Sequence, residues 1–272
     1  MHSSAPQIFG ILNITTDSFS DGGRYLDPEA AIAHAQGLAA QGADVIDVGP
    51  ASSNPKAGKV GAAEEIRRLE AVMPALKSLA RPLSIDSFEP ETQRWALAQG
   101  VDYLNDIQGF PNPELYPQLA EAPAKLVLMH SLQQAEKADA RPPPQGDILG
   151  HICAYFEARL EALAKAGVDV AARVILDPGM GMFLGNKEES SFRVLAGIGE
   201  LKGRFGLPVL ISVSRKSFLR HLTGRDVGEA GPATLAAELL AVERGADFIR
   251  THEPAPLRDA LAVRQALWAQ AP

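Results

Sequence analysis

Eight short apolar segments recur along the 272-residue chain, and each is followed by a stretch with helical spacing. A strand buried on both faces and followed by a helix is the repeating unit of a parallel sheet with crossover helices. Eight such units, with no linker rich in serine or glycine, favour a (β/α)8 TIM barrel in one domain, residues 1–272, over a doubly wound open sheet. The expected strands, some with additional flanking residues, are Ile8–Leu12, Val45–Val48, Leu83–Ile85, Tyr103–Leu104, Leu126–Met129, Val174–Leu176, Val209–Val213 and Phe248–Ile249.

A tripeptide that suits the end of a helix recurs three times, each time immediately before an expected strand. It reads Gly-Ala-Asp at 42–44 and 245–247, and Gly-Val-Asp at 100–102. Glycine ends helices readily because it adopts the left-handed conformation without strain. We therefore interpret the tripeptide as one structural unit repeated around the barrel. Prolines at the first helical position predict three helix starts, at Asp27-Pro28, Glu89-Pro90 and Glu253-Pro254.

The composition is that of a soluble globular protein and argues against several classes of protein. Lys and Arg total 26 and Asp and Glu total 33, so the net charge of −7 disfavours a general surface for nucleic acid. Residues 1–7 do not have the pattern of a signal peptide, and no apolar run reaches the ~18 residues of a membrane span, so we expect a cytoplasmic protein. The single cysteine, Cys153, lies in an apolar helical pattern and is expected to pack in the core.

The first expected strand ends at Asn13 and opens into a loop that contains Asp17 and Asp21. Hydroxyl residues and two glycines fill the rest of this loop, up to Gly23, which suits a mobile segment better than an ordinary turn. The active site of a TIM barrel lies at the carboxyl ends of its strands. All eight strands of this chain end in or near polar residues or a histidine, among them Asn13, Asp47, Ser53, Asn54, Asp86, Asn105, Asp106, His130, Asp177, Ser214, Lys216, Arg250 and His252.

Two cationic side chains follow the eighth strand, which barrel closure places beside the first. Arg250 and His252 can therefore approach Asn13 and hold a phosphate or pyrophosphate between them. The amide oxygen of Asn13 is a suitable ligand for Mg²⁺ carried by that anion. The alternative is a structural arginine paired with a neighbouring carboxylate.

Carboxylates and an amide line the other side of the expected mouth. Asp86, Asn105 and Asp177 would satisfy a flat heterocycle rich in donors, such as an amino-pyrimidine, whose paired N–H groups resemble a guanidinium. Lys216 is close enough in chain order to balance the charge of Asp177. Structural salt bridges among these residues, and a solvated basic turn around Lys216, are the alternatives.

Taken together, these motifs resemble the dihydropteroate synthase family over nearly the whole chain. They are ILNITTDSFSDGG at 11–23, GADVIDVG at 42–49, SIDS at 84–87, LNDIQG at 104–109, DPGMG at 177–181, SRKS at 214–217 and RTHE at 250–253. The resemblance implies the joining of 4-aminobenzoate to 6-hydroxymethyl-7,8-dihydropterin diphosphate, with release of pyrophosphate.

The resemblance also implies roles for single residues. Asp17, Lys216 and Arg250 become the catalytic residues, with Asp17 on a first loop that orders over the substrates. The pterin pocket comprises Asp86, Asn105, Asp177 and Lys216, and the diphosphate site comprises Asn13, Arg250 and His252, with Asn13 as the Mg²⁺ ligand. An SN1-like path needs no protein nucleophile, because the dihydropterin can delocalise positive charge as the C–O bond breaks.

Two loops depart from the family pattern. Asn54 replaces the usual arginine of the second loop, and the loop at 179–185 is longer and bulkier than usual. Both features look similar to the sulfonamide-resistant branch, in which Phe183 could clash with the part of a sulfonamide that extends beyond the shared aniline. The expected aminobenzoate pocket comprises Phe19, Ser53, Asn54, Phe183 and Ser214.

Other readings remain open at this stage. A pterin-binding methyltransferase presents similar carboxylates but has no use for a diphosphate site, and a non-catalytic pterin-binding protein would release no pyrophosphate. Residues 133–146 form an expected long loop that is either a solvated connection or a lid. The apolar helix around 235–242 either packs on the barrel or joins a dimer interface, and the resemblance favours a homodimer.

Overall fold

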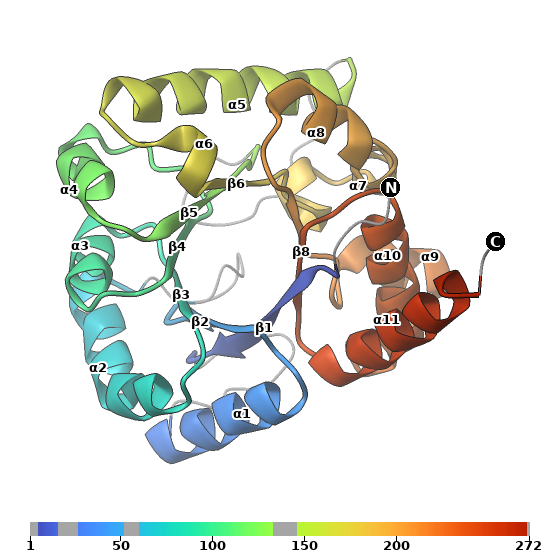
Figure 1. Cartoon of the computed structure of the whole chain (residues 1–272), viewed down its shortest axis with the longest axis horizontal. Coiled ribbons are helices and arrows are strands. Elements are labelled where there is room, and N and C mark those ends of the chain that lie inside the picture. The colour runs from blue at the N-terminus through green and yellow to red at the C-terminus, as the bar shows by residue number, and fades with distance from the viewer. Residues whose placement is uncertain (1–4, 16–26, 52–59, 133–145, 271–272) are drawn as a thin grey trace.

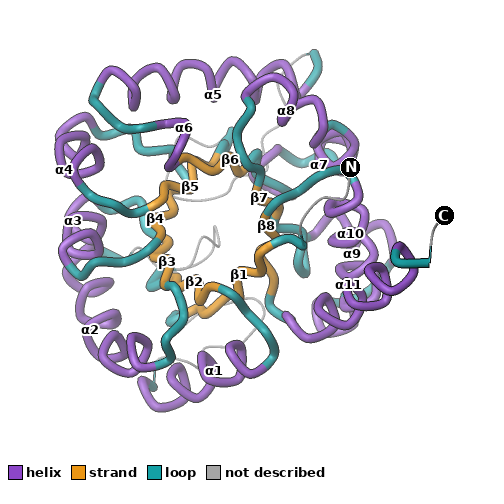
Figure 2. The backbone as a smooth tube through the Cα atoms, in the orientation of Figure 1, coloured by secondary structure: helices purple, strands orange, loops and turns teal. Residues whose placement is uncertain are grey.

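The computed structural model describes residues 5–15, 27–51, 60–132 and 146–270, which form a ring of eight parallel strands surrounded by helices (Figures 1 and 2). The hydrogen-bonded order is β6-β5-β4-β3-β2-β1-β8-β7, and a parallel bridge between Leu176 and Val209 links β6 to β7. The predicted (β/α)8 barrel is thereby confirmed. The strands are β1 Gln7–Asn13, β2 Val45–Gly49, β3 Leu83–Asp86, β4 Tyr103–Asp106, β5 Lys125–Met129, β6 Val174–Asp177, β7 Leu210–Ile211 and β8 Phe248–Thr251.

Most strands extend beyond their apolar segments and include the polar residues at their carboxyl ends. Asp86, Asn105 and Asp177 are strand residues, and their backbone positions are consequently fixed by pairing with neighbouring strands. The seventh strand is the exception. The expected span Val209–Val213 is wrong in length, because β7 pairs with β8 over Leu210–Ile211 and meets β6 only through the bridge at Val209.

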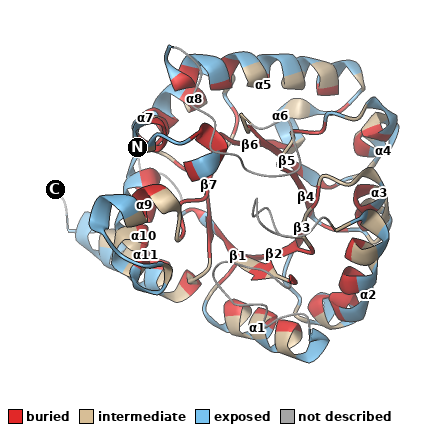
Figure 3. Ribbon diagram, turned by 180° about the vertical axis from the view of Figure 1, so that it is seen from behind, coloured by how far each residue is buried: buried red, intermediate tan, exposed pale blue. Residues whose placement is uncertain are grey.

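The helices cover the outside of the ring, with buried residues on their inner faces and exposed residues outside (Figure 3). Pro28, Pro90 and Pro254 each occupy the first position of a helix, as predicted, and Asp27 accepts a hydrogen bond from the N–H of Glu29 at 3.2 Å. The helices are α1 Pro28–Ala40, α2 Ala62–Ser78, α3 Pro90–Ala98, α4 Tyr116–Glu121, α5 Ile148–Lys165, α6 Val170–Arg173, α7 Glu188–Ala196, α8 Ile198–Phe205, α9 Ser217–Thr223, α10 Gly231–Glu243 and α11 Pro254–Trp268. Short 3-10 turns occur at Pro113–Leu115, Gly181–Leu184 and Val227–Glu229.

Two apolar layers hold this arrangement together. The larger layer fills the space between sheet and helices and contains Cys153, which confirms its predicted place in the core. The smaller layer fills the amino-terminal half of the barrel and is centred on Phe9, whose ring packs edge-on against Tyr103 and Phe248 at centroid distances of 5.0 and 5.7 Å. Inside the barrel, the space left for polar side chains is therefore the carboxyl-terminal half.

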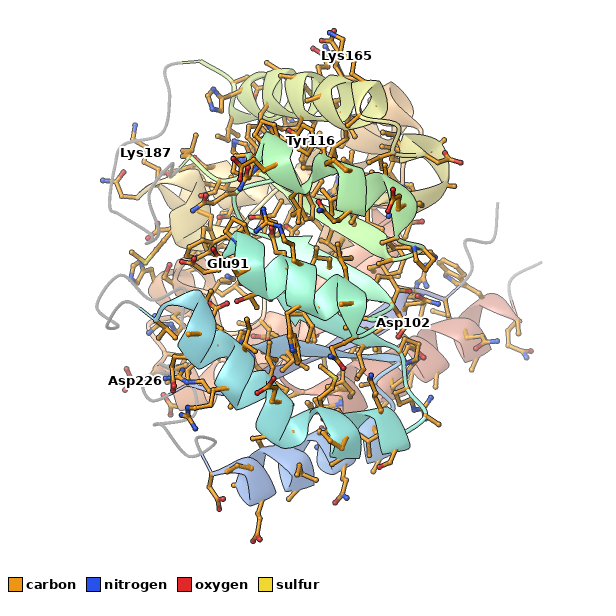
Figure 4. The ribbon with its side chains drawn as sticks, turned by 90° about the vertical axis from the view of Figure 1, so that its left-hand side faces the viewer. Glu91, Asp102, Tyr116, Lys165, Lys187 and Asp226 are labelled. Carbon is orange, nitrogen blue, oxygen red and sulfur yellow. The ribbon has the colours of Figure 1, made fainter. Side chains whose placement is uncertain are left out.

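The repeated tripeptide closes the amino-terminal end of the barrel. Its glycines at 42, 100 and 245 have positive φ angles, and its aspartates each accept a hydrogen bond from a backbone N–H at or near the start of the neighbouring strand. The pairs are Ile8 N with Asp44 Oδ2 at 2.7 Å, Leu83 N with Asp102 Oδ2 at 2.8 Å, and Val209 N with Asp247 Oδ2 at 2.9 Å. Figure 4 shows Asp102 at this end of the barrel and Glu91 at the other. The interpretation as one repeated structural unit is confirmed.

Among the described residues, no helix combines the length and the apolar character that a membrane crossing requires.

Candidate functional site

Arg250 occupies the centre of the polar half of the barrel. Its Nε lies 2.7 Å from Asp47 Oδ2 on β2, and its Nη1 donates to Asp177 Oδ2 on β6 at 3.0 Å. All three residues are less than a tenth exposed. Burial lowers the pKa of the guanidinium, but the charges of Asp47, Asp177 and Asp86 outweigh burial and leave the Arg250 pKa raised. One permanent cation therefore connects three strands across the interior.

The sequence analysis gave a structural arginine paired with a carboxylate as the alternative for Arg250, and the structure contains that pairing. The guanidinium still has capacity for a ligand, because Nη2 is buried and has no hydrogen-bond partner among the described residues. Asp47 Oδ1 is likewise buried and has no hydrogen-bond partner among the described residues. The centre of the site thus offers donor capacity on Arg250 and a free acceptor on Asp47.

Asp86 and Asn105 lie side by side on β3 and β4 and are register partners. Asn105 Nδ2 donates to Asp86 Oδ1 at 2.5 Å, and Asn105 Oδ1 has no partner in the described part of the chain. Burial and then the charge of Asp47 raise the pKa of Asp86 to about 7, against the opposing effects of Arg250 and Asn105. Asp86 therefore titrates near neutral pH, and any ligand that donates to it favours the ionised form.

Asp177 is held from both sides at the end of β6. Its Oδ1 accepts a hydrogen bond from the N–H of Gly179 at 2.9 Å, and its other oxygen binds Arg250. Burial raises the pKa of Asp177, and the positive charges of Arg250 and Lys216 act in the opposite direction. The structure thus brings Asp177 and Lys216 into electrostatic contact, as their expected shared pocket requires.

Lys216 lies over the ring of Phe183, with Nζ 4.9 Å from the ring centroid. Burial lowers the Lys216 pKa, which Asp177 partly restores. Phe183 is 8% exposed and packs with Met129 and Ile107. The neighbouring Arg215 has a left-handed φ of 58° and directs its guanidinium to Glu253, 3.4 Å away. Lys216 is accordingly the member of this cationic pair that faces the carboxylates.

His252 and Ser214 form a hydrogen-bonded pair. Ser214 Oγ lies 2.9 Å from His252 Nδ1 and accepts a hydrogen bond from the His252 N–H at 3.2 Å. Burial, followed by the charges of Arg215 and Lys216, lowers the pKa of His252 to about 3. The expectation of a second cation here is wrong for the free protein, because a partly buried imidazole beside two positive side chains favours its neutral form at physiological pH.

Asn13 is the last residue of β1 and pairs with Gly49 on β2. A Cβ on Gly49 would lie 3.2 Å from Asn13 Oδ1, so the glycine leaves room for this amide. Close by, Arg68 Nη1 donates to the carbonyls of Ile14 and Pro50 at 3.2 and 2.8 Å and fixes the chain where β1 and β2 end. The described residues contain no cluster of three or more His, Cys, Asp or Glu side chains that could hold a metal by themselves.

Several expected site residues lie outside the described part of the chain. They are Asp17, Phe19, Ser53 and Asn54, together with most of the expected loop at 133–146.

Sequence reasoning noted Asp47 only as a residue at the end of a strand and gave it no role. The sequence could have indicated a role for Asp47, because β2 places this residue beside Ile11, near the carboxyl end of β1. Sequence reasoning gave no role to Glu238 or to Thr251. Glu238 lies among small and apolar residues in the middle of α10, and it is 1% exposed. An acid at such a position is a usable signal, since a buried carboxyl requires a partner.

Comparisons with known proteins give matches along nearly the whole chain. The family model described as pterin binding enzyme matches residues 9–252. The chain is 62% identical over 260 residues to dihydropteroate synthase type-2 of Escherichia coli, which covers 96% of this chain and 95% of that protein.

Two solved structures of dihydropteroate synthase from Xanthomonas albilineans share the fold. The structure with 4-aminobenzoic acid has a TM-score of 0.87 and 38% identity, and covers 98% of this chain and 94% of that one. The complex with 7,8-dihydropteroate has a TM-score of 0.83 and 36% identity, and covers 98% and 95% respectively.

Proposed function

Since this chain belongs to the dihydropteroate synthase family of pterin-binding enzymes, we propose that it joins 6-hydroxymethyl-7,8-dihydropterin diphosphate to 4-aminobenzoate and releases pyrophosphate. The likeness to a structure that holds 7,8-dihydropteroate supports this product. In this proposal the whole chain, residues 1–272, acts as one pterin-binding domain.

The observation that carries the proposal is the set of facing hydrogen-bonding groups in the barrel. Asp86, Asn105 and Asp177 present acceptor oxygens, and Asn105 Oδ1 is buried with no partner among the described residues. An amino-pyrimidine ring carries N–H donors in the fork geometry that such acceptors require. Lys216 and Arg250 then balance the carboxylate charges on the pterin side.

The diphosphate lies, in this proposal, between β1 and β8. His252 is neutral and its Nδ1 is bonded to Ser214, which leaves Nε2 to donate a hydrogen bond to the anion. Arg250 contributes its charge and the free Nη2.

Asn13 fits a Mg²⁺ ion that arrives with the diphosphate, because Mg²⁺ in such sites takes one or two protein oxygens and completes its shell with phosphate and water. The glycine at position 49 leaves room at this amide. When bound, the ion would stabilise negative charge on the departing pyrophosphate.

The reaction we propose is an SN1-like substitution at the methylene carbon of the pterin. The C–O bond breaks first, and pyrophosphate leaves with the electron pair while the pterin ring shares the positive charge. The lone pair of the aminobenzoate nitrogen then forms the new C–N bond, and that nitrogen loses a proton. Asp86 and Asp177 favour the cationic intermediate, and Arg250 favours the anionic leaving group. Asp17, on the first loop, is proposed as a further catalytic residue.

The aminobenzoate pocket is proposed to comprise Phe19, Ser53, Asn54, Phe183 and Ser214. Its amine must reach the methylene carbon next to the pterin pocket, and Phe183 already contacts Lys216 of that pocket. We propose that the ring of Phe183 excludes the larger sulfonamides and makes the enzyme insensitive to them. The similarity to a type-2 enzyme supports this placement in the resistant branch.

A homodimer is proposed from the exposed apolar side chains on one side of the molecule. Helices α10 and α11 pack against each other, with α9 beside α10 (Figure 1). They expose Leu222, Leu240, Val263 and Leu267 by 52% to 71%, and a second copy of the chain would cover such a surface. Sedimentation of the native protein and of Leu240→Glu at micromolar concentration tests this, and a native monomer would refute it.

A pyrophosphate-release assay with Mg²⁺, the dihydropterin diphosphate and 4-aminobenzoate tests the function. We expect Lys216→Ala and Arg250→Ala to lose about a hundredfold or more in kcat/KM, whereas Arg258→Ala, at the opposite end of the barrel, should stay within about twofold of the native enzyme. Full activity in both site variants would refute the site assignment. No pyrophosphate from the native protein would refute the function itself.

The same assay with sulfamethoxazole tests the specificity. We expect micromolar drug to leave the native enzyme active and to inhibit Phe183→Gly, with the KM for 4-aminobenzoate changed much less. Inhibition of the native enzyme at that concentration would sink the proposal of insensitivity.

A further inference from the structure

Helix α10 buries two polar residues that its composition does not predict. Thr234 and Glu238 are 3% and 1% exposed in a helix otherwise rich in alanine and leucine. They are four residues apart, so both lie on the same face of the helix. That face packs on the barrel, and burial of a carboxyl there is costly unless hydrogen bonds compensate it.

Both side chains reach backbone or hydroxyl groups of the diphosphate side of the site. Thr234 Oγ1 accepts a hydrogen bond from the N–H of Arg215 at 3.1 Å. Glu238 forms a side-chain hydrogen bond with Thr251, which stands between Arg250 and His252 on β8. Its second oxygen, Oε1, has no partner in the described regions. Helix α10 therefore supports two chain segments that end at the site.

The hydroxyl groups beyond Glu238 form a continuous series. Thr251 Oγ1 lies 3.4 Å from Ser214 Oγ and donates to it, and Ser214 Oγ lies 2.9 Å from His252 Nδ1. The backbone adds two donors, since the N–H of Glu253 binds Thr251 Oγ1 at 3.3 Å and the N–H of His252 binds Ser214 Oγ at 3.2 Å.

The count of hydrogens is complete when this series runs from Glu238 towards His252. A hydroxyl has one hydrogen and two acceptor positions. With Thr251 as the donor, Ser214 accepts from Thr251 and from the His252 N–H, and its own hydrogen goes to His252 Nδ1. Thr251 accepts from the Glu253 N–H and gives its hydrogen to Ser214, which leaves one acceptor position for a donor.

Glu238 can be that donor only in its acid form. Burial raises its pKa to about 8 and the charge of Glu253 acts in the same direction, whereas a hydrogen bond donated by Thr251 to the carboxylate acts against both. At neutral pH most of Glu238 therefore carries a proton, which it can donate to the remaining acceptor position of Thr251 Oγ1. An ionised Glu238 would instead draw the Thr251 hydrogen away from Ser214.

We propose that Glu238 is a positioning residue that acts through Thr251 and Ser214 to hold the ring of His252, with Nδ1 as acceptor and the proton on Nε2. The Nε2–H group then points to the diphosphate as a neutral donor and follows the leaving pyrophosphate without a change of charge. This inference rests on the proposed function, because that function places the diphosphate at His252.

The test compares variants that break the series with variants that keep it. Glu238→Leu and Thr251→Val break it, Glu238→Gln restores a donor to Thr251, and Glu243→Leu is a matched control at an exposed glutamate of the same helix. Two readouts are taken from each protein. The first is the ¹⁵N signals of the His252 ring, assigned with His252→Gln, and the second is the KM for each substrate.

We expect native protein, Glu238→Gln and Glu243→Leu to show one tautomer with the proton on Nε2. Glu238→Leu and Thr251→Val should show a mixture of tautomers and a kcat/KM for the dihydropterin diphosphate about tenfold lower, with the KM for 4-aminobenzoate within about twofold. An unchanged tautomer and an unchanged KM for the diphosphate substrate in both breaking variants would overturn the proposal.

Two further outcomes are separable. If Glu238→Leu does not fold, Thr251→Val and the Glu238→Gln rescue decide, because each conserves the volume of the side chain it replaces. If native protein releases no pyrophosphate, the proposed function fails, and the ¹⁵N signals still decide whether Glu238 orients the ring.

Discussion

The two ends of the barrel use the same residue in opposite ways. At the amino end, Asp44, Asp102 and Asp247 are each bonded to a strand N–H, and two of them also pair with a partly exposed cation. At the carboxyl end, Asp47, Asp86 and Asp177 lie around the buried guanidinium of Arg250. Figure 4 shows these ends as opposite sides of one strand ring. Acids at the amino end bind the backbone of neighbouring strands, whereas acids at the carboxyl end line the candidate ligand site.

The difference is clearest at β2, where Asp44 and Asp47 are only three residues apart. Asp44 is about one-third exposed and pairs with Arg258, whose exposure is similar. Asp47 is 4% exposed and keeps one oxygen without a partner among the described residues. Incomplete pairing in a buried site is costly for the free protein, and substrate donors can relieve that cost on binding.

The largest expected effect comes from removing the cation at each end. Arg250→Met leaves Asp47 and Asp177 buried without their partner, and we expect a loss of about 3–5 kcal/mol in the free energy of unfolding. Arg258→Met removes a partly exposed ion pair and should cost at most about 1 kcal/mol. Urea denaturation of both variants at pH 7.5 measures the difference.

A pH series sharpens this comparison. Without Arg250, the charge that opposes burial at Asp177 is lost, so the folded pKa of Asp177 rises further above its unfolded value. The variant then binds more protons when folded, and its stability should fall as the pH rises. Equal losses of unfolding free energy in the two variants would contradict the assignment of the two ends. A loss of unfolding free energy in Arg250→Met that grows at acid pH would also contradict it.

The next largest effect is on catalysis. Asp177→Asn removes a charge that Arg250 and Lys216 face and replaces one acceptor oxygen by a donor, so we expect kcat/KM for the dihydropterin diphosphate to fall about a hundredfold. Asp247→Asn keeps an oxygen for the N–H of Val209 and should stay within about twofold. Steady-state pyrophosphate release measures both, and similar values for the two variants would count against a functional role for the carboxyl end.

A smaller effect is expected from pH alone, through Asp86. Its pKa of about 7 is raised by burial and by the charge of Asp47, and the ionised form accepts the pterin donors. Affinity for a pterin that lacks a diphosphate should therefore rise up to about tenfold per unit below pH 7 and level off above it. Because this folded pKa exceeds the unfolded value, the same group makes the protein less stable as the pH rises toward 7.

Calorimetry between pH 5.5 and 8.5 gives the affinity profile. Asp86→Asn should flatten it, and Asp44→Asn should leave it unchanged. A native profile that is already flat, or one that still bends near pH 7 in Asp86→Asn, would show that another group controls binding.

The arrangement of the fold was predictable because it depends on patterns that repeat. The strand and helix alternation gave the barrel, and the tripeptide at 42–44, 100–102 and 245–247 pointed to its closed end. The span of β7 was wrong, because apolar residues at Val209–Val213 carry no sign of how few of them pair. Pairing length depends on neighbouring strands that one segment cannot reveal.

The gathering of the strand-end side chains was predictable, but the bonds among them were not. Strand ends identified Asp86, Asn105, Asp177 and Arg250, since position along a strand fixes which end of a barrel a residue occupies. The predicted positive charge of His252 was wrong for the free protein, because the His252 pKa depends on burial and on the charges of Arg215 and Lys216. Glu238 was missed for the same reason, as its role appears only when α10 packs against β8.

The smallest expected effect separates the repeated unit from catalysis. Asp102→Ala removes the acceptor of the Leu83 N–H, a bond of 2.8 Å at the start of β3, and we expect a loss of about 1 kcal/mol in unfolding free energy. Asp102→Asn keeps an acceptor and should lose less. Both variants should retain native kcat/KM for each substrate, because Asp102 precedes the first residue of β4, whereas Arg250 binds Asp177 at the carboxyl end of β6. Chemical denaturation and steady-state kinetics on the same samples test this, and a raised KM for the dihydropterin diphosphate in Asp102→Ala would mean that the amino end also shapes the site.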